Sequence, residues 1–285
     1  EFAKQFKIPH DICGKLIVAT HQSELAHMNK VFQNGIDNGV EDMEIIDAKR
    51  IKEIEQFCEG IAGIRVGCTG IIDYDAVAKK YAELINSKTN GSKVLTGQHV
   101  VDFIRGENET TVITKTSQFK AKYIITTSGL QADRMAKKEG QPSDAAIIGF
   151  RGDYYDLTEK GLSKVNHLIY PVPNPKFPFL GVHFTRMITG GTECGPNAVF
   201  VFDREGYSKT AFNLKDTADA FSYKGTWKFF AKHWRFGLDE YRGAFSKTYF
   251  LNRLRKLIPT LQMEDIVASR CGLRAMALGP AGEML

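Results

Sequence analysis

The sequence alternates between short stretches with the two-residue period of β-strands and longer stretches with the 3.6-residue period of amphipathic helices. Polar residues that can accept hydrogen bonds from a first helical turn precede or open the helical stretches: Ser23, Asp47, Asp73 and Asp239. The predicted strands lie at 13–19, 43–46, 93–96, 99–105, 110–116, 119–127, 145–156 and 266–278. The predicted helices lie at 23–34, 48–57, 74–87, 217–235 and 239–257. Because neither element dominates, the pattern predicts a mixed α and β fold.

Two further stretches stand out from this alternation. The run 119–127 ends in a continuous apolar segment and is followed by Ser128 and Gly129. Such a run predicts a buried parallel strand that delivers its carboxyl end to a ligand. The segment 60–70 contains four glycines and predicts a loop.

The stretch 169–198 is apolar but interrupted by prolines. Four prolines between 171 and 178 each lack a backbone donor, which favours an edge strand or a crossing loop there. Residues 179–184 predict a buried strand with His183 as its one polar side chain, followed by a turn at 188–191 and a second short strand. This hairpin would present polar side chains on the rigid surface of a sheet.

Composition narrows the class of protein. The chain has 285 residues, 43% hydrophobic and 25% charged, which is ordinary for one large or two average globular domains. The formal net charge of +5 is spread along the chain, which argues against a nucleic-acid-binding face and allows a weak attraction to anionic membranes. Five cysteines without Cys-x-x-Cys spacing predict reduced thiols and no metal site. We therefore expect a protein that is cytoplasmic or peripheral to a membrane on a reducing side.

Several motifs occur in order along nearly the whole chain. They are CGKLIV at 13–18, TGIIDY at 69–74, FRGDY at 150–154, YPVP at 170–173, FPFLGVHFTRM at 177–187, GPNAV at 195–199, REGY at 204–207 and GLRA at 272–275. Together they resemble the FAD-dependent L-2-hydroxyglutarate dehydrogenase/oxidase family, which belongs to the D-amino-acid-oxidase/glycine-oxidase type of flavoprotein.

The resemblance implies a fold that is both α/β and α+β. It implies a partial FAD-binding Rossmann-like domain and a substrate domain built on a mixed, largely antiparallel sheet. The FAD-binding part would comprise 71–144, the substrate-binding domain 14–70 and 145–270, and 271–285 would begin the return into the FAD-binding domain. Flavoproteins of this type hold the FAD pyrophosphate at a Gly-x-Gly-x-x-Gly turn, and no such motif occurs in the sequence. We expect a fragment that lacks the N-terminal glycine motif and the C-terminal flavin-binding segment, and that binds FAD weakly or not at all by itself.

The resemblance implies two catalytic residues. Arg274 would hold the substrate's alpha-carboxylate through a bidentate fork, and the alternative is a surface arginine paired with Glu283. His183 would either accept the proton of the substrate hydroxyl or hydrogen-bond to that hydroxyl, since a neutral imidazole is suited to take a proton. The alternative for His183 is a hydrogen-bonded core residue.

Three substrate-binding residues are implied as well. Tyr170 stands where related oxidases place a substrate-binding tyrosine, and the alternative is a core aromatic residue. Arg151 would be a second carboxylate anchor or the partner of Asp153. Asn197 would donate to the substrate or cap a turn.

Four residues are implied to contact the cofactor, FAD. Val100 would offer backbone groups to the adenine. Thr127, Ser128 and Gly129 would let the backbone approach the adenosine-diphosphate portion, because their side chains are small. Simple strand packing is the alternative for all four.

The implied activity is FAD-dependent oxidation of an L-2-hydroxy acid, most directly L-2-hydroxyglutarate to 2-oxoglutarate, by hydride transfer to the flavin. The partners would be a small dicarboxylate substrate and a quinone or oxygen as electron acceptor, without nucleic acid. Two alternatives stay open: an amino-acid oxidase of the same architecture, and an inactive carboxylate-binding fragment.

Overall fold

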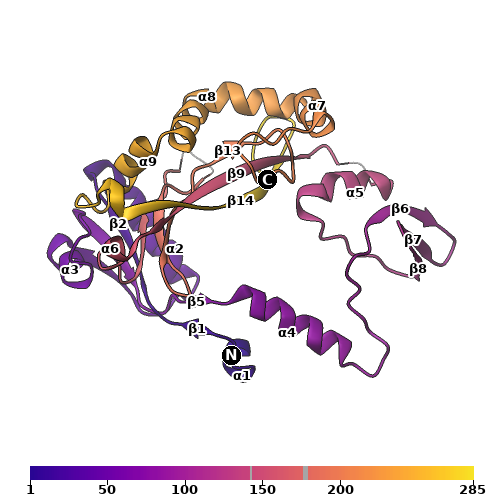
Figure 1. Cartoon of the computed structure of the whole chain (residues 1–285), viewed down its shortest axis with the longest axis horizontal. Coiled ribbons are helices and arrows are strands. Elements are labelled where there is room, and N and C mark those ends of the chain that lie inside the picture. The colour runs from indigo at the N-terminus through magenta and orange to yellow at the C-terminus, as the bar shows by residue number, and fades with distance from the viewer. Residues whose placement is uncertain (142, 176–178) are drawn as a thin grey trace. The chain divides into compact units, whose positions relative to one another are not determined.

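The computed structural model describes residues 1–141, 143–175 and 179–285 of the chain (Figure 1). Phe177 and Pro178, which begin one of the family-like motifs, lie outside the described residues. The chain forms two compact units, each built from three separate segments. The first unit comprises Glu1–Val77, Arg151–Val199 and Trp234–Gly272, and the second comprises Ala78–Phe150, Phe200–His233 and Leu273–Leu285.

The bounds of the elements follow the chain. The helices are α1 (Phe2–Gln5), α2 (Leu25–Asp37), α3 (Ala48–Ile54), α4 (Tyr74–Asn86), α5 (Ala132–Lys138), α6 (Glu159–Leu162), α7 (Leu214–Ser222), α8 (Lys224–Phe245) and α9 (Lys247–Leu254). The strands are β1 (His10–Asp11), β2 (Lys15–Ala19), β3 (Met43–Asp47), β4 (Ala62–Val66), β5 (Ile71–Ile72), β6 (Val100–Arg105), β7 (Thr110–Thr114), β8 (Gln118–Ala121), β9 (Ala146–Leu157), β10 (Leu168–Pro171), β11 (His183–Arg186), β12 (Thr192–Gly195), β13 (Val199–Phe200) and β14 (Ile266–Leu278).

A large sheet organises the first unit. Its strands follow the order β9-β12-β11-β10-β2-β4-β3, and β13 and β14 also pair with β9. The β10–β2 pair is parallel, whereas the other pairs along this path are antiparallel. The predicted mixed, largely antiparallel sheet is thus confirmed.

One face of this sheet is the main core of the first unit. Successive side chains of β2, β10, β11 and β12 point to opposite faces of the sheet. Those on this face form one buried cluster with side chains of α9, the helix that lies over this face in Figure 1. The largest fully buried members are Leu16, Ile169, Phe184, Phe250, Leu251 and Leu254.

The opposite face is covered only in part. There α2 packs its apolar side chains against Ile17 and Ile64 of β2 and β4. Lys15, Tyr170 and His183 belong to strand positions of the same face and are half-buried rather than enclosed. The half-buried side chains of Lys15, Tyr170 and His183 therefore share one face of the sheet.

The second unit contains a small antiparallel sheet, β6-β7-β8. It also contains a separate aromatic core, in which Phe150 meets the rings of Phe200 and Phe229 at centroid distances of 6.3 and 5.7 Å. Which unit carries flavin and which carries substrate stays a prediction, as do the predicted domain boundaries.

Several predictions of strands and loops were wrong. Residues 93–96 form no strand, and of the strand predicted at 179–184 only His183 and Phe184 belong to one, β11. The glycine-rich segment 60–70 contains strand β4, because its glycines serve close packing rather than turning: a Cβ on Gly63 would lie 3.0 Å from the Ile17 carbonyl oxygen. The predicted strand 119–127 ends as β8 at Ala121, and Tyr123 and Ile125 are 91% and 90% exposed. A buried parallel strand needs neighbours, and no strand of the described residues pairs with 122–127.

Two helix starts were also placed wrongly. His21, not Ser23, caps the turn that leads into α2, since its side chain accepts a hydrogen bond from the Ser23 backbone amide. Asp239 lies inside α8, and Ser246 instead caps the next helix by accepting from the amide of Tyr249. The caps at Asp47 and Asp73 are confirmed by their bonds to the amides of Arg50 and Ala76.

Candidate functional site

The hairpin of the first unit brings Tyr170 and His183 together. Ile169 pairs with Phe184 across the antiparallel β10–β11 ladder, so the next residue along β10 stands opposite the previous one on β11. As a result the rings of Tyr170 and His183 stack with centroids 4.2 Å apart and planes 16° apart. The Tyr170 hydroxyl also lies 3.4 Å from the Thr185 hydroxyl.

The position and tautomer of His183 are fixed by its surroundings. Its Nδ1 lies 2.8 Å from the carbonyl oxygen of Gly181. A carbonyl oxygen only accepts, so Nδ1 carries the proton, and the Nε2 of the neutral ring holds the lone pair. The contact with Gly181 and the stacking on Tyr170 together fix the orientation of the imidazole ring.

A cation that sequence reasoning passed over lies beside this pair. The Nζ of Lys15 lies 5.2 Å from the centroid of the Tyr170 ring. Burial lowers the pKa of Lys15, an effect that Cys68 partly offsets. Its signal in the sequence is a lysine in an otherwise apolar strand, at a position that alternates with the core residues Leu16 and Val18.

Arg151 and Asn197 belong to a different, closed arrangement. The Nε of Arg151 donates to Asp153 at 2.9 Å. The Asn197 side chain accepts from the Asp153 backbone amide at 2.7 Å and donates to its carboxylate at 3.1 Å. All three residues are buried. This network stabilises the junction of β9 with the turn after β12, and the predicted role of Arg151 and Asn197 in substrate binding stays a prediction.

A cavity of about 610 Å³ lies next to the hairpin in the first unit. Its walls include Pro171, Gly181 and Val182, which adjoin Tyr170 and His183 in sequence, but its lining does not include those two rings. Charged side chains also line this cavity, and two of them, Arg253 and Glu240, form an ion pair at 2.8 Å.

The implied cofactor residues lie in the second unit. Val100 begins β6 and pairs with Thr114 of β7. The Ser128 hydroxyl is buried and has no hydrogen-bond partner in the described part of the chain. Gly129 has a φ of +51° and open space where a Cβ would stand. An orphaned hydroxyl beside open glycine backbone fits an oxygen-rich ligand such as the diphosphate portion of FAD.

Arg274 also lies in the second unit, at a half-buried position of β14. His183 belongs to the first unit and Arg274 to the second, so the convergence of the two side chains on one substrate stays a prediction.

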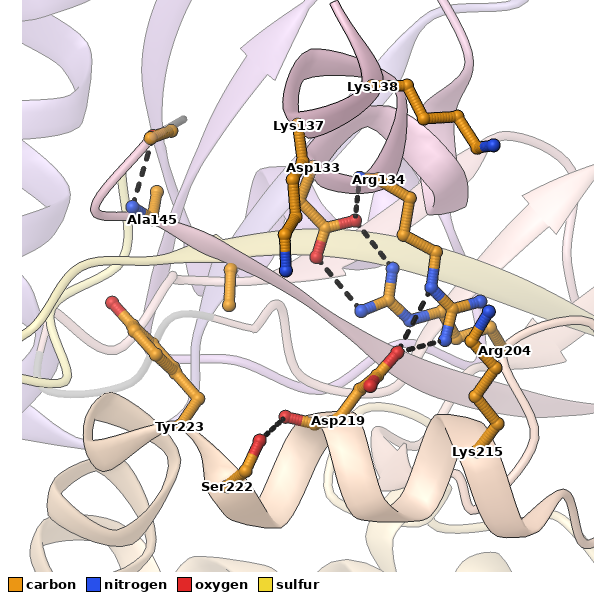
Figure 2. A pocket seen from close by; sticks show the side chains of 12 residues that line it. Asp133, Arg134, Lys137, Lys138, Ala145, Arg204, Lys215, Asp219, Ser222 and Tyr223 are labelled. Atoms are coloured by element: carbon orange, nitrogen blue, oxygen red, sulfur yellow. Dashed lines mark hydrogen bonds and ion pairs between the residues drawn. The ribbon is translucent and has the colours of Figure 1, made fainter. Parts of the chain in front are cut away.

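Ion pairs line a second cavity, of about 660 Å³, in the second unit. Figure 2 shows the Arg204 guanidinium beside the Asp133 carboxylate. The two terminal nitrogens of Arg204 donate to the two carboxylate oxygens of Asp133 at 2.6 and 2.9 Å. Arg134 of α5 donates to Asp219 and, at 2.7 Å, to Asp216, both on α7. The two arginines thereby tie α5 to α7 and to the turn that follows β13.

Removing the Arg204 guanidinium should destabilise the protein strongly. Burial alone would raise the pKa of Asp133, but the hydrogen bonds from Arg204 and from the Ile147 amide hold it below its usual value. Asp133 therefore contributes stability above its unfolded pKa of about 3.9 and loses it as the pH falls through the lower folded value. We expect Arg204→Met to lower the free energy of unfolding in urea at pH 7 by about 1.5–3 kcal/mol, since it removes both guanidinium bonds from a carboxylate whose side chain is only 17% exposed.

The same variant should lose stability at higher pH than the wild type, because Asp133 would keep only its bonds from the Ile147 and Arg134 amides and its pKa would rise. Arg50→Gln is the matched control: it breaks an exposed pair with Glu53 and should cost under about 1 kcal/mol. Equal effects of the two substitutions would show that the network is not structural.

Two features of the described residues bear on membrane and metal chemistry. Among the helices of the described residues, none is both long and apolar enough to cross a bilayer. Within the same residues, no group of three or more His, Cys, Asp or Glu side chains is arranged to hold a metal ion.

The fold is that of known flavoenzymes. The chain superposes on an L-alpha-glycerophosphate oxidase of Mycoplasma pneumoniae, a structure with FAD bound, with a TM-score of 0.71 at 20% identity, covering 97% of this chain and 65% of that one. It also superposes on L-proline dehydrogenase from P. horikoshii with a TM-score of 0.66 at 16% identity, covering 98% of this chain and 62% of that one. The predicted fold class is confirmed at the level of architecture.

Curated relatives are closer in sequence. The chain is 39% identical to L-2-hydroxyglutarate dehydrogenase of Indibacter alkaliphilus, over 100% of this chain and 71% of the relative. It is 38% identical to the mitochondrial enzyme of that name from Nematostella vectensis and 35% identical to that of Escherichia coli K12, over 65% and 67% of their lengths. The chain thus spans about two thirds of these relatives. The resemblance found in its motifs is confirmed.

A family model described as FAD dependent oxidoreductase matches residues 1–284. The orphaned hydroxyl at Ser128 and the open backbone at Gly129 agree with the cofactor that this description names. The chain therefore belongs to the FAD-dependent oxidoreductase family, the family to which its motifs pointed.

Proposed function

We propose that the whole protein oxidises L-2-hydroxyglutarate to 2-oxoglutarate. The observation that carries this proposal is the group of relatives named L-2-hydroxyglutarate dehydrogenase, which are 35–39% identical to this chain over its full length. FAD, when bound, supplies the acceptor for the hydride that leaves the alpha carbon. The protein's own part is to bind, orient and deprotonate the hydroxy acid.

His183 is proposed as the group that takes the hydroxyl proton. Its Nδ1 proton is committed to Gly181, so the Nε2 lone pair is the basic site of the ring. Tyr170 supports the ring by stacking on it and holds its hydroxyl near Thr185. The proton would thus move from the substrate hydroxyl to Nε2 as the carbon–hydrogen bond breaks.

Arg274 is proposed as the anchor of the alpha-carboxylate. A guanidinium presents two parallel N–H donors to a carboxylate, which fixes the acid in orientation as well as in place. Arg151 remains the predicted second anchor, although its guanidinium already donates to Asp153.

We also propose functions for the units themselves. The first unit would form the substrate-binding surface, because it contains the stacked Tyr170–His183 pair. The second would contribute to the FAD site through Val100 and the segment 127–129.

Anaerobic mixing of the full-length, FAD-loaded protein with candidate acids tests this function. L-2-hydroxyglutarate should bleach the flavin absorbance, and L-glutamate should not. Bleaching by L-glutamate alone would replace the hydroxy-acid assignment with the amino-acid oxidase alternative. Bleaching by neither acid would favour a carboxylate-binding role.

For the electron acceptor we favour a membrane quinone over oxygen, and peripheral attachment to the membrane that holds it. The support is an aromatic patch on the second unit, formed by Phe202, Phe212, Phe221 and Trp227. Neighbouring ring centroids in it are 5.3 to 6.4 Å apart. Phe212 is 63% exposed and Trp227 is 58% exposed. Exposed aromatic clusters of this kind suit the boundary between water and lipid.

Lysines lie on the two helices that contribute to the aromatic patch. Lys224 and Lys228 flank Trp227 on α8, and Lys215 lies on α7. Lysines near an anionic membrane surface each add about 1 kcal/mol to binding. The combination supports attachment to a bilayer rich in anionic lipid.

Replacing Phe212 and Trp227 together by serine should weaken sedimentation with phosphatidylglycerol vesicles about 10- to 100-fold, because two apolar anchors are lost. Tyr123→Ser is the control, since Tyr123 is 91% exposed in the same unit but outside the aromatic patch. A wild-type protein that stays in the supernatant with these vesicles would refute the attachment.

A further inference from the structure

The ammonium group of Lys15 stands on the polar face of the sheet without an acidic partner. Within the described residues no carboxylate forms an ion pair with Lys15, although seventeen other ion pairs are present. Its surroundings include the ring of Tyr170, with Nζ 5.2 Å from the ring centroid, and the Cys68 thiol. Lys15 is half-buried, and a cation withdrawn from water is costly unless an anion compensates it.

Two acids of the first unit that lie on the same sheet as Lys15 or close to it in sequence are already paired. Glu193, on the same sheet, pairs with Arg270 at 2.6 Å. Asp11, close in sequence, pairs with Arg186 at 3.2 Å. An anion for Lys15 must therefore come from outside these side chains.

Strand register ties Lys15 to the proposed catalytic pair. In the parallel β10–β2 ladder Tyr170 pairs with Ile17, so Lys15, two residues earlier, lies on the same face. Tyr170 in turn stacks on His183. The ammonium, the phenol and the imidazole thus form one row across three adjacent strands.

We propose that Lys15 binds the distal carboxylate of the substrate and so selects a dicarboxylate over a monocarboxylate. This inference rests on the proposed function, because it takes the hydroxy acid to lie over His183. The second anchor predicted for that carboxylate, Arg151, is buried and donates to Asp153, whereas Lys15 has no such acid beside it. An ammonium on a flexible stem can reach a carboxylate at the far end of a five-carbon acid.

The test compares two acids in the full-length, FAD-loaded protein. L-2-hydroxyglutarate carries the distal carboxylate, and L-2-hydroxyvalerate has a methyl group in its place. Lys15→Gln should raise KM for L-2-hydroxyglutarate about 10- to 100-fold and leave KM for L-2-hydroxyvalerate within about twofold. Lys15→Arg should recover part of the affinity for the dicarboxylate, since it restores the charge.

A binding measurement separates this inference from the proposed function. Calorimetric titration with glutarate, which cannot be oxidised at a hydroxyl, should show Kd raised about 10- to 100-fold by Lys15→Gln even if the natural substrate is a different diacid. Lys49→Gln on α3 is the control and should leave Kd unchanged. Urea unfolding of Lys15→Gln should show a loss of stability of at most about 1 kcal/mol, because the charge forms no ion pair and its contact with the Tyr170 ring is weak.

Two outcomes would overturn the assignment. Equal rises in KM for both acids would mean that Lys15 supports the site only through packing. An unchanged Kd for glutarate would mean that the distal carboxylate binds elsewhere.

Discussion

Replacing His183 by asparagine is expected to lower kcat for L-2-hydroxyglutarate by about 10²- to 10⁴-fold, the usual contribution of a positioned general base. The asparagine amide can still donate to the Gly181 carbonyl, as His183 does now, but it offers no basic nitrogen in place of Nε2. The rate of flavin reduction in anaerobic rapid mixing is the measurement, because it isolates the chemical step.

Chemical rescue distinguishes a base from a packing residue. Added imidazole should restore part of the rate of the His183→Asn variant, and KM should change much less than kcat. His27→Asn, on α2, serves as the control for histidine replacement in general. A His183→Asn enzyme that reduces flavin at the wild-type rate would remove His183 from the chemistry.

Replacing Arg274 by lysine is expected to raise KM for L-2-hydroxyglutarate about 100-fold, because a point charge cannot reproduce the two parallel bonds of a guanidinium to a carboxylate. Steady-state kinetics with the full-length enzyme, over a range of substrate that reaches the raised KM, is the measurement. Product inhibition by 2-oxoglutarate should weaken by a similar factor, since it carries the same alpha-carboxylate.

Arg50→Lys, at an exposed position of α3, controls for the general effect of exchanging arginine for lysine. An unchanged KM in the Arg274→Lys enzyme would take Arg274 out of the carboxylate site.

Much of the fold could be predicted because local pattern and packing agree. Strands β2 and β14 and the helices capped by Asp47 and Asp73 follow directly from alternation and cap chemistry. The segment 119–127 could not be predicted, because a buried strand and an exposed extended segment have the same apolar sequence. Only the presence of neighbouring strands distinguishes them, and that is a property of the tertiary structure.

The candidate site divides in the same way. The motifs singled out Tyr170 and His183, but only the register of β10 against β11 explains why their rings stack. Lys15 was passed over because a single lysine in an apolar strand carries no chemistry until its neighbours are known. Its parallel pairing with β10, which places it beside Tyr170, joins residues more than 150 positions apart in sequence.

Arg151 illustrates the opposite case. Its sequence neighbour Asp153 offered an ion pair from the start, and the structure contains that pair in a buried network closed by Asn197. An ion pair between residues two positions apart can be predicted from sequence. Whether Arg151 also binds substrate depends on which of its N–H groups can still donate to a ligand.

The central claim is that Arg274 and His183 act on one hydroxy acid lying against the flavin. A crystal structure of the full-length protein with FAD and 2-oxoglutarate measures this most directly. The account predicts the Arg274 guanidinium in two hydrogen bonds to the carboxylate next to the keto group, and His183 Nε2 within hydrogen-bond distance of the keto oxygen. A complex in which 2-oxoglutarate lies against the flavin without touching either side chain would contradict it.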